Sequence, residues 1–123
     1  MKETVLGIVK GLSYALDGYK GAFKEDRHYR INFFLSMLGT GLSIAFLKGE
    51  LSLIVALSNY LVFVAELINT AVERAVDTAT REYRESAKLA KDASAAAVLS
   101  IGLFALALDV KFLLPEIVKR LTW

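Results

Sequence analysis

Four polar side chains recur along a segment that is otherwise apolar. The segment Glu66-Leu-Ile-Asn69-Thr-Ala-Val-Glu73-Arg-Ala-Val-Asp77 closes a run, 51–72, in which Glu66 is the only charged residue. Successive residues of an α-helix are about 100° apart, so the four side chains lie within about 80° of one another. A carboxylate in an apolar span usually faces protein or water rather than lipid. The stripe therefore predicts a polar site, and a stripe that only joins helices remains the alternative.

Charged side chains, including two of the stripe itself, are predicted to gather near the Asp77 end of this stripe. They come from three segments and comprise Glu25, Asp26, Glu73, Asp77, Lys91 and Asp92. Carboxylate oxygens suit Mg²⁺, which also binds substrate phosphates, and a lysine can neutralise charge on a phosphoryl group. Glu66 lies about 10 Å deeper along the helix than Glu73 and is placed to take a proton from a lipid hydroxyl. The pattern indicates phosphoryl transfer from a nucleotide to a membrane-borne alcohol.

The elements that must position these residues are helices. The chain has 123 residues, enough for one domain, and 55% of them are hydrophobic. Apolar spacing predicts an amphipathic surface helix over 4–24, and uncharged runs predict transmembrane spans over 31–47, 51–72 and 93–108. The expected fold is an all-α integral membrane bundle, with a short tail that begins at Phe112 and ends in an interfacial anchor, Trp123.

The distribution of basic residues predicts the orientation of the bundle. Lys and Arg number 6 before the first span, 1 in the first loop, 5 in the second loop and 3 in the tail. The positive-inside rule then places the N-terminus and the second loop in the cytoplasm. A net charge of +2, without an interleaved basic and aromatic surface, argues against a nucleic-acid partner. Small residues in the first span and short span lengths favour a homo-oligomer.

The twelve-residue segment 66–77 resembles the signature of the prokaryotic diacylglycerol kinase family, Glu-x-x-Asn-[Ser/Thr]-Ala-x-Glu-x-x-x-Asp. Ala90-Lys91-Asp92 resembles the family's segment before the third span, and Asp26-Arg-His-Tyr-Arg30 resembles its junction before the first span. The resemblance covers nearly the whole chain in order and spacing. It implies a homotrimer in the bacterial inner membrane that uses ATP and Mg²⁺ to convert diacylglycerol to phosphatidic acid, with active sites shared between protomers.

The resemblance also implies a role for individual residues. Glu66 would be the general base on the lipid hydroxyl, and Asn69 would orient the substrate beside it. Asp26 and Glu73 would bind Mg²⁺ and, through it, ATP. The remaining nucleotide contacts would be Tyr14, Glu82, Tyr83, Arg84, Lys91 and Asp92.

Several alternatives remain open from the sequence. The family also contains undecaprenol kinases, and a protein of another class, a small oligomeric transporter, could use Glu66 as a proton or cation site. The family usually has Glu where Asp26 stands, so Glu25 is the alternative metal ligand. Many members have Gly-Ser where this chain has Ser94-Ala95.

Overall fold

The chain folds into helices joined by short connections. The computed structural model describes residues 2–122, so the predicted anchor Trp123 lies outside the described residues. The helices are α1 (Lys2–Glu25), α2 (Arg27–Phe46), α3 (Gly49–Ala79), α4 (Glu85–Leu108) and α5 (Leu114–Leu121), and a π-helical segment, η1 (Asp109–Leu113), joins α4 to α5. The prediction of an all-helical chain is confirmed over this range.

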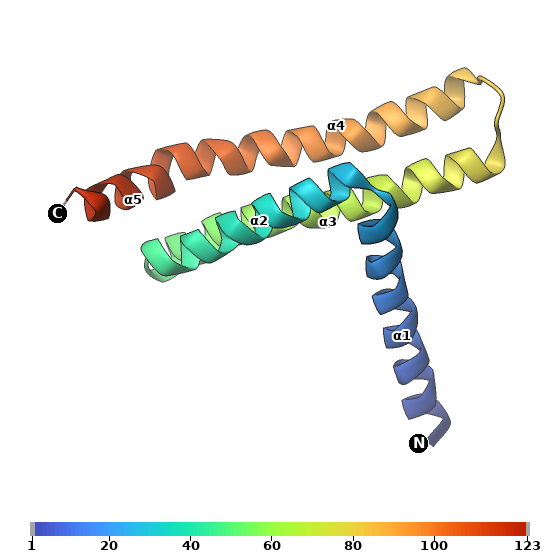
Figure 1. Cartoon of the computed structure of the whole chain (residues 1–123), viewed down its shortest axis with the longest axis horizontal. Coiled ribbons are helices and arrows are strands. Elements are labelled where there is room, and N and C mark those ends of the chain that lie inside the picture. The colour runs from blue at the N-terminus through green and yellow to red at the C-terminus, as the bar shows by residue number, and fades with distance from the viewer. Residues whose placement is uncertain (1, 123) are drawn as a thin grey trace.

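Helix α3 is the central element of the bundle. It packs against α2 on one side and against α4 on the other, while α1 makes few contacts and points away from the other helices (Figure 1). An extended connection over 80–84 reverses the chain between α3 and α4. The polar stripe of α3 therefore has helices on both sides to cover it.

The junction between α1 and α2 is fixed by side chains that bond to helix ends. Asp26 is the N-cap of α2, and its Oδ1 accepts a hydrogen bond from the Tyr29 N–H at 3.1 Å. The Arg30 guanidinium donates to the carbonyl oxygens of Phe23 at 2.9 Å and Lys24 at 3.1 Å, which end α1 without helical partners. These bonds hold Asp26 in place between two helices.

The connection between α2 and α3 is only two residues long. Gly49, the first residue of α3, has a φ of +61°, a left-handed conformation that glycine adopts without steric cost. Close to this turn, Leu47, Val55 and Leu113 form a buried apolar cluster. Arg120 of α5 donates hydrogen bonds to the carbonyl oxygens of Ala45 and Phe46 at the end of α2. This end of the bundle is thus closed by α5.

A close approach of α2 to α3 depends on one glycine. A Cβ atom at Gly39 would lie 2.3 Å from Asn59 Oδ1, so only glycine fits against this side chain. Asn59 is buried, and its Nδ2 donates to Asp109 Oδ1 at 2.9 Å. Gly39 therefore makes room for a polar contact between α3 and η1.

Polar contacts also fix the antiparallel register of α3 and α4. Lys91 of α4 bonds to Asp77 of α3 near one end, and Asp109 of η1 bonds to Asn59 of α3 further along. The two bonds are separated by 18 residues, about 27 Å, on each of the two antiparallel segments. Asp109 is therefore level with Asn59, well inside the apolar run 51–72. The helix continues past Leu108, where the third span is predicted to end, and Asn59 gives the Asp109 carboxylate a partner there.

The long apolar helices are poorly covered within one chain. Two helical segments, Gly49–Ala79 and the continuous Glu85–Leu121, are long and apolar enough to cross a membrane. In the second segment, only 11% of an apolar stretch of 18 residues is buried. A core helix of a water-soluble protein would be mostly buried, so these surfaces fit an integral membrane protein. The predicted span 31–47 in α2 is not one of these two segments.

Replacing Gly39 with Ala should destabilise the fold. The added Cβ would displace Asn59 and weaken its bond to Asp109, at a cost of about 1–3 kcal/mol. Thermal unfolding in detergent would measure the loss. Gly41→Ala is the matched control in the same helix, because a Cβ there meets nothing within 4 Å. Equal melting temperatures for the two variants would contradict the proposed packing.

Candidate functional site

Residues of three helices line an open cavity beside the polar stripe of α3. The cavity has a volume of about 310 Å³, and we call it the interhelical cavity. Its lining residues come from α3, from α4 and from the start of α2: Asp26, His28, Asn32, Glu66, Asn69, Glu73, Ala95, Val98 and Leu99. Glu66, Asn69 and Glu73 thus share one face, as the helical spacing predicts.

Asp26 reaches this cavity from the junction of α1 and α2. Its Oδ2 accepts a hydrogen bond from the Thr70 hydroxyl of α3 at 3.1 Å, while its Oδ1 is held by the Tyr29 N–H. Burial tends to raise the pKa of Asp26, but these hydrogen bonds and one from the backbone of His28 outweigh burial and lower the pKa below its ordinary value. Asp26 is therefore ionised at neutral pH and available to a cation.

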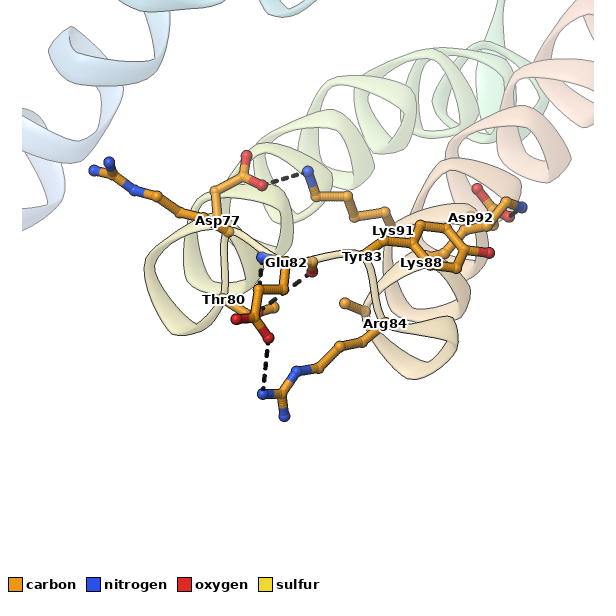
Figure 2. Close-up of a pocket in the computed structure, with 10 residues that line it drawn as sticks. Asp77, Thr80, Glu82, Tyr83, Arg84, Lys88, Lys91 and Asp92 are labelled. Atoms are coloured by element: carbon orange, nitrogen blue, oxygen red, sulfur yellow. Dashed lines mark hydrogen bonds and ion pairs between the residues drawn. The ribbon is translucent and has the colours of Figure 1, made fainter.

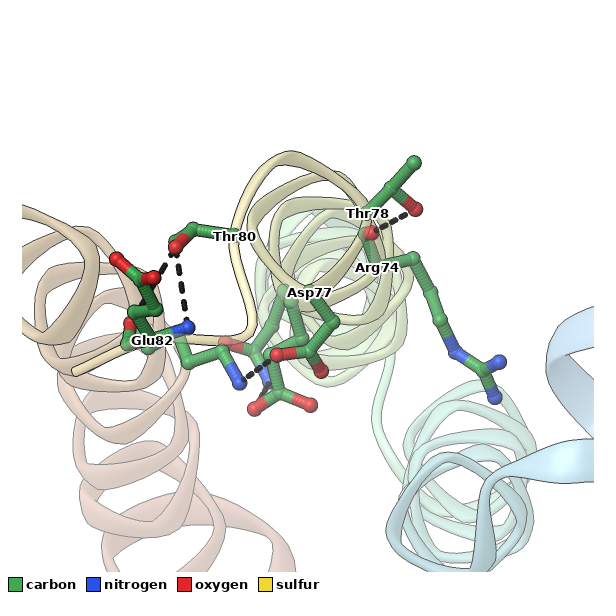
Figure 3. Close-up of polar contacts among 8 residues, drawn as sticks. Arg74, Asp77, Thr78, Thr80 and Glu82 are labelled. Carbon is green, nitrogen blue, oxygen red and sulfur yellow. Dashed lines mark hydrogen bonds and ion pairs between the residues drawn. The ribbon is translucent and has the colours of Figure 1, made fainter. Parts of the chain in front are cut away.

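Glu25, the alternative metal ligand, points elsewhere. Its carboxylate forms an ion pair with the Arg74 guanidinium at 2.7 Å, and it does not line the interhelical cavity. Figure 3 shows Arg74 turned away from Asp77, on the side of α3 nearer α1 and α2. Of the two acids at the junction, the geometry favours Asp26.

Glu73 is held by a chain of hydrogen bonds that begins on α4. The Ser94 hydroxyl donates to Asn69 Oδ1 at 2.6 Å, and Asn69 Nδ2 donates to Glu73 Oε1 at 3.2 Å. Asn69 is buried, and Ser94 and Glu73 are half-buried. The carboxylate of Glu73 is therefore oriented by its neighbours before any ligand binds.

The carboxylates of the cavity fit an ion that keeps water and phosphate ligands. Asp26 and Glu73 supply hard oxygen donors, and Glu66, 4% exposed, lies deeper in the same cavity. Over residues 2–122, no group of three or more His, Asp or Glu side chains forms a complete metal cage. Mg²⁺ is often bound by one or two carboxylates together with substrate phosphates, so this donor set suits it.

A second, larger pocket lies where α3 ends and α4 begins. Its volume is about 810 Å³, and we call it the connection pocket (Figure 2). Five predicted nucleotide contacts line it, namely Glu82, Tyr83, Arg84, Lys91 and Asp92. Asp77, at its edge, is one helical turn from Glu73 of the interhelical cavity, or about 6 Å. The two sites therefore adjoin along α3.

Four cationic and three acidic side chains line the connection pocket, and three of these cations form ion pairs with the three acids. Lys91 Nζ donates to Asp77 Oδ1 at 2.5 Å across the two helices. Lys88 pairs with Asp92 within α4, and Arg84 pairs with Glu82 at 3.6 Å. The first turn of α4 also offers backbone N–H groups without helical partners, which suit phosphate. A polyphosphate could replace the acidic partners of these cations.

The connection between α3 and α4 is shaped by a local turn. Thr80 Oγ1 accepts a hydrogen bond from the Glu82 N–H at 3.2 Å and lies 3.4 Å from the Glu82 carbonyl oxygen (Figure 3). Such hydroxyl-to-backbone bonds are typical of turns. Thr80 thus positions Glu82 and Tyr83 at the mouth of the connection pocket.

One predicted contact lies apart from both sites. Tyr14 is exposed on α1, which points away from the other helices (Figure 1), and it does not line the connection pocket. The chain's own fold does not bring Tyr14 to the other predicted nucleotide contacts.

Some residues of the site were not expected from the sequence. Thr70 bonds to the predicted ligand Asp26, Ser94 bonds to Asn69 next to the predicted ligand Glu73, and Lys88 lines the connection pocket. Thr70 follows Glu66 by four residues and Ser94 follows Lys91 by three, so helical spacing alone would have placed each beside a predicted site residue. Their partners lie on other helices, and the sequence does not show which helix faces which.

The fold and the cavity between its helices define an α-helical integral membrane protein with a buried acidic site. A family model described as prokaryotic diacylglycerol kinase matches residues 13–113. The chain belongs to this family, so the resemblance is confirmed.

Relatives named diacylglycerol kinase align over most of the chain. One from Synechocystis is 37% identical over 108 residues, covering 86% of this chain and 62% of the relative. One from Haemophilus influenzae is 33% identical over 92 residues, 74% of this chain and 78% of the relative. One from Helicobacter pylori strain 26695 is 38% identical over 100 residues, 78% of this chain and 75% of the relative. The chain thus spans less than two thirds of the Synechocystis protein.

Proposed function

We propose that this chain transfers the γ-phosphoryl group of ATP to the hydroxyl of diacylglycerol and forms phosphatidic acid and ADP. One observation carries the proposal: a cavity with three carboxylates adjoins a pocket lined by four cationic side chains, and α3 contributes residues to both. The first suits a metal ion and a proton acceptor, and the second suits a triphosphate. The names of the relatives support diacylglycerol as the lipid.

In the proposed reaction Glu66 is the general base. Its carboxylate takes the proton of the lipid hydroxyl while the hydroxyl oxygen forms a bond to the γ-phosphorus. The bond between the γ-phosphorus and the bridging oxygen breaks, and ADP leaves. Asn69 lies one turn from Glu66 in the same cavity and orients the lipid hydroxyl.

Asp26 and Glu73 would hold Mg²⁺, which would neutralise charge on the phosphates while the γ-phosphoryl group is transferred. Thr70 and Asn69 hold the two carboxylates in place through hydrogen bonds. Glu73 lies between Glu66 and the connection pocket along α3. In this order the metal ligands would lie between the general base Glu66 and the nucleotide.

The connection pocket would hold the nucleotide. Lys91 and Arg84 would exchange their acidic partners for phosphate oxygens. Tyr83, a residue that is 78% exposed, would stack against the base. Glu82 and Asp92 would contact the remainder of the nucleotide. In this arrangement the second loop and the N-terminus face the cytoplasm of the bacterial cell, where ATP is found.

The active enzyme would be a homotrimer in the inner membrane, with α2 as a third span and α1 at the membrane surface. Apolar side chains along α4 are exposed within one chain, among them Leu99, Leu103 and Phe104. A neighbouring protomer would cover part of this surface. It would also allow Tyr14 on α1 to reach the nucleotide of an adjacent site.

The purified protein should transfer labelled phosphate from ATP to diacylglycerol in detergent or bilayers, and Mg²⁺ should be required. Undecaprenol, assayed in parallel, tests the alternative lipid. Transfer to undecaprenol alone would reject diacylglycerol as the substrate. Ion flux through liposomes without ATP, combined with no phosphorylation of either lipid, would support the transporter instead.

Replacing Glu66 with Gln should lower kcat by at least about 100-fold, because the amide cannot take the hydroxyl proton. The oligomer should stay intact, as size-exclusion chromatography would show. Glu50→Gln is the matched control, since Glu50 is an exposed acid in the first turn of the same helix. Full activity of Glu66→Gln would remove the proposed base.

Replacing Lys91 with Met should raise the KM for ATP about 10- to 100-fold, the effect of losing a charge-assisted hydrogen bond to phosphate. The KM for the lipid should change little. Lys48→Met, in the connection at the other end of the bundle, serves as the control. An unchanged KM for ATP in Lys91→Met would argue against a nucleotide in the connection pocket.

A further inference from the structure

We propose that Ser94 is a positioning residue that sets the metal affinity of the site by fixing the side-chain amide of Asn69, which in turn orients Glu73. This inference rests on the proposed function, because it treats Glu73 as a metal ligand. The observations behind it are the two hydrogen bonds that link Ser94, Asn69 and Glu73.

The direction of these bonds follows from the chemistry of their end point. An ionised carboxylate only accepts hydrogen bonds, so the atom of Asn69 that faces Glu73 Oε1 must be the donor Nδ2. The carbonyl Oδ1 of Asn69 then faces Ser94, and the Ser94 hydroxyl must donate to it. The contact of 2.6 Å fits a well-formed bond.

The same hydroxyl has a competing acceptor on its own helix. Ser94 Oγ lies 2.9 Å from the Lys91 carbonyl oxygen, but a hydroxyl has only one hydrogen to donate. Of these two contacts of the Ser94 hydroxyl, the one to Asn69 is shorter, and it is the one that reaches from α4 to α3. Ser94 therefore acts between helices, rather than as a residue that merely bonds back to its own backbone.

Loss of the hydroxyl would leave the amide of Asn69 without a fixed orientation. Asn69 is 8% exposed, so its Oδ1 would lack a ready replacement donor from water. The amide could then rotate and present its oxygen to Glu73, which would repel the carboxylate. Glu73 would lose the orientation that a metal ion requires, whereas Asp26 would keep its separate bonds to Thr70 and Tyr29.

Replacing Ser94 with Ala should therefore weaken metal binding about tenfold, as expected for loss of a partner that orients a metal ligand. Mn²⁺ can stand in for Mg²⁺, and electron paramagnetic resonance would report its Kd in the presence of a non-hydrolysable ATP analogue. In the assay with diacylglycerol, the Mg²⁺ concentration for half-maximal activity should rise by a similar factor.

Two further variants make the test specific. Ser94→Thr keeps a hydroxyl and should restore most of the metal affinity. Ser100→Ala removes a hydroxyl from the same helix, one that bonds only to the Ala96 carbonyl oxygen, and should change nothing. A purely structural role would lower the melting temperature of Ser94→Ala without a selective change in metal affinity.

The outcomes separate this inference from the proposed function. Metal affinity in Ser94→Ala equal to that of the unaltered protein would overturn the role of Ser94 and leave the kinase proposal standing. If the unaltered protein binds no Mn²⁺ with nucleotide and phosphorylates no lipid, the proposed function fails, and the role of Ser94 fails with it.

Discussion

The polar face of α3 must find polar partners in an otherwise apolar protein, and this constraint determines how the helices pack. A buried polar group without a hydrogen bond is costly, and among the described residues no buried side-chain nitrogen or oxygen lacks a partner. Thr70 meets Asp26 from the start of α2, Asn69 meets Ser94 of α4, and Asn59 meets Asp109 of η1. The polar contacts therefore specify an arrangement that apolar packing alone would leave loose.

This packing also separates two environments along one helix. Glu66 is almost fully buried, whereas Asp77, about 16 Å further along, has a side chain that is 61% exposed. The proposed reaction uses both environments, since the lipid hydroxyl would approach from the apolar layer and the charged nucleotide from water. Glu73 is half-buried between them. A straight helix that crosses the boundary can thus bring together substrates that do not share a solvent.

Helical spacing was enough to predict the helical fold and the shared face of Glu66, Asn69 and Glu73. It could not predict contacts between helices, because these depend on rotation and register that no local pattern records. Ser94 and Thr70 were missed for this reason. The contact of Asp109 was missed as well, because a charged residue that follows an uncharged run gives no sign of a partner such as Asn59, 50 residues earlier in the chain. Tyr14 shows a further limit, since it is not among the residues of this chain that line the connection pocket.

The bond between Asn59 and Asp109 has a consequence for how the protein enters the bilayer during synthesis. A lone aspartate at the centre of a helix opposes insertion by about 2.5–3.5 kcal/mol. Its amide partner sits on the preceding long helix, 50 residues earlier in the chain. The last hydrophobic segment would therefore partition more readily when α3 is already in place beside it. Biogenesis would then favour entry of the two segments as a pair rather than one at a time.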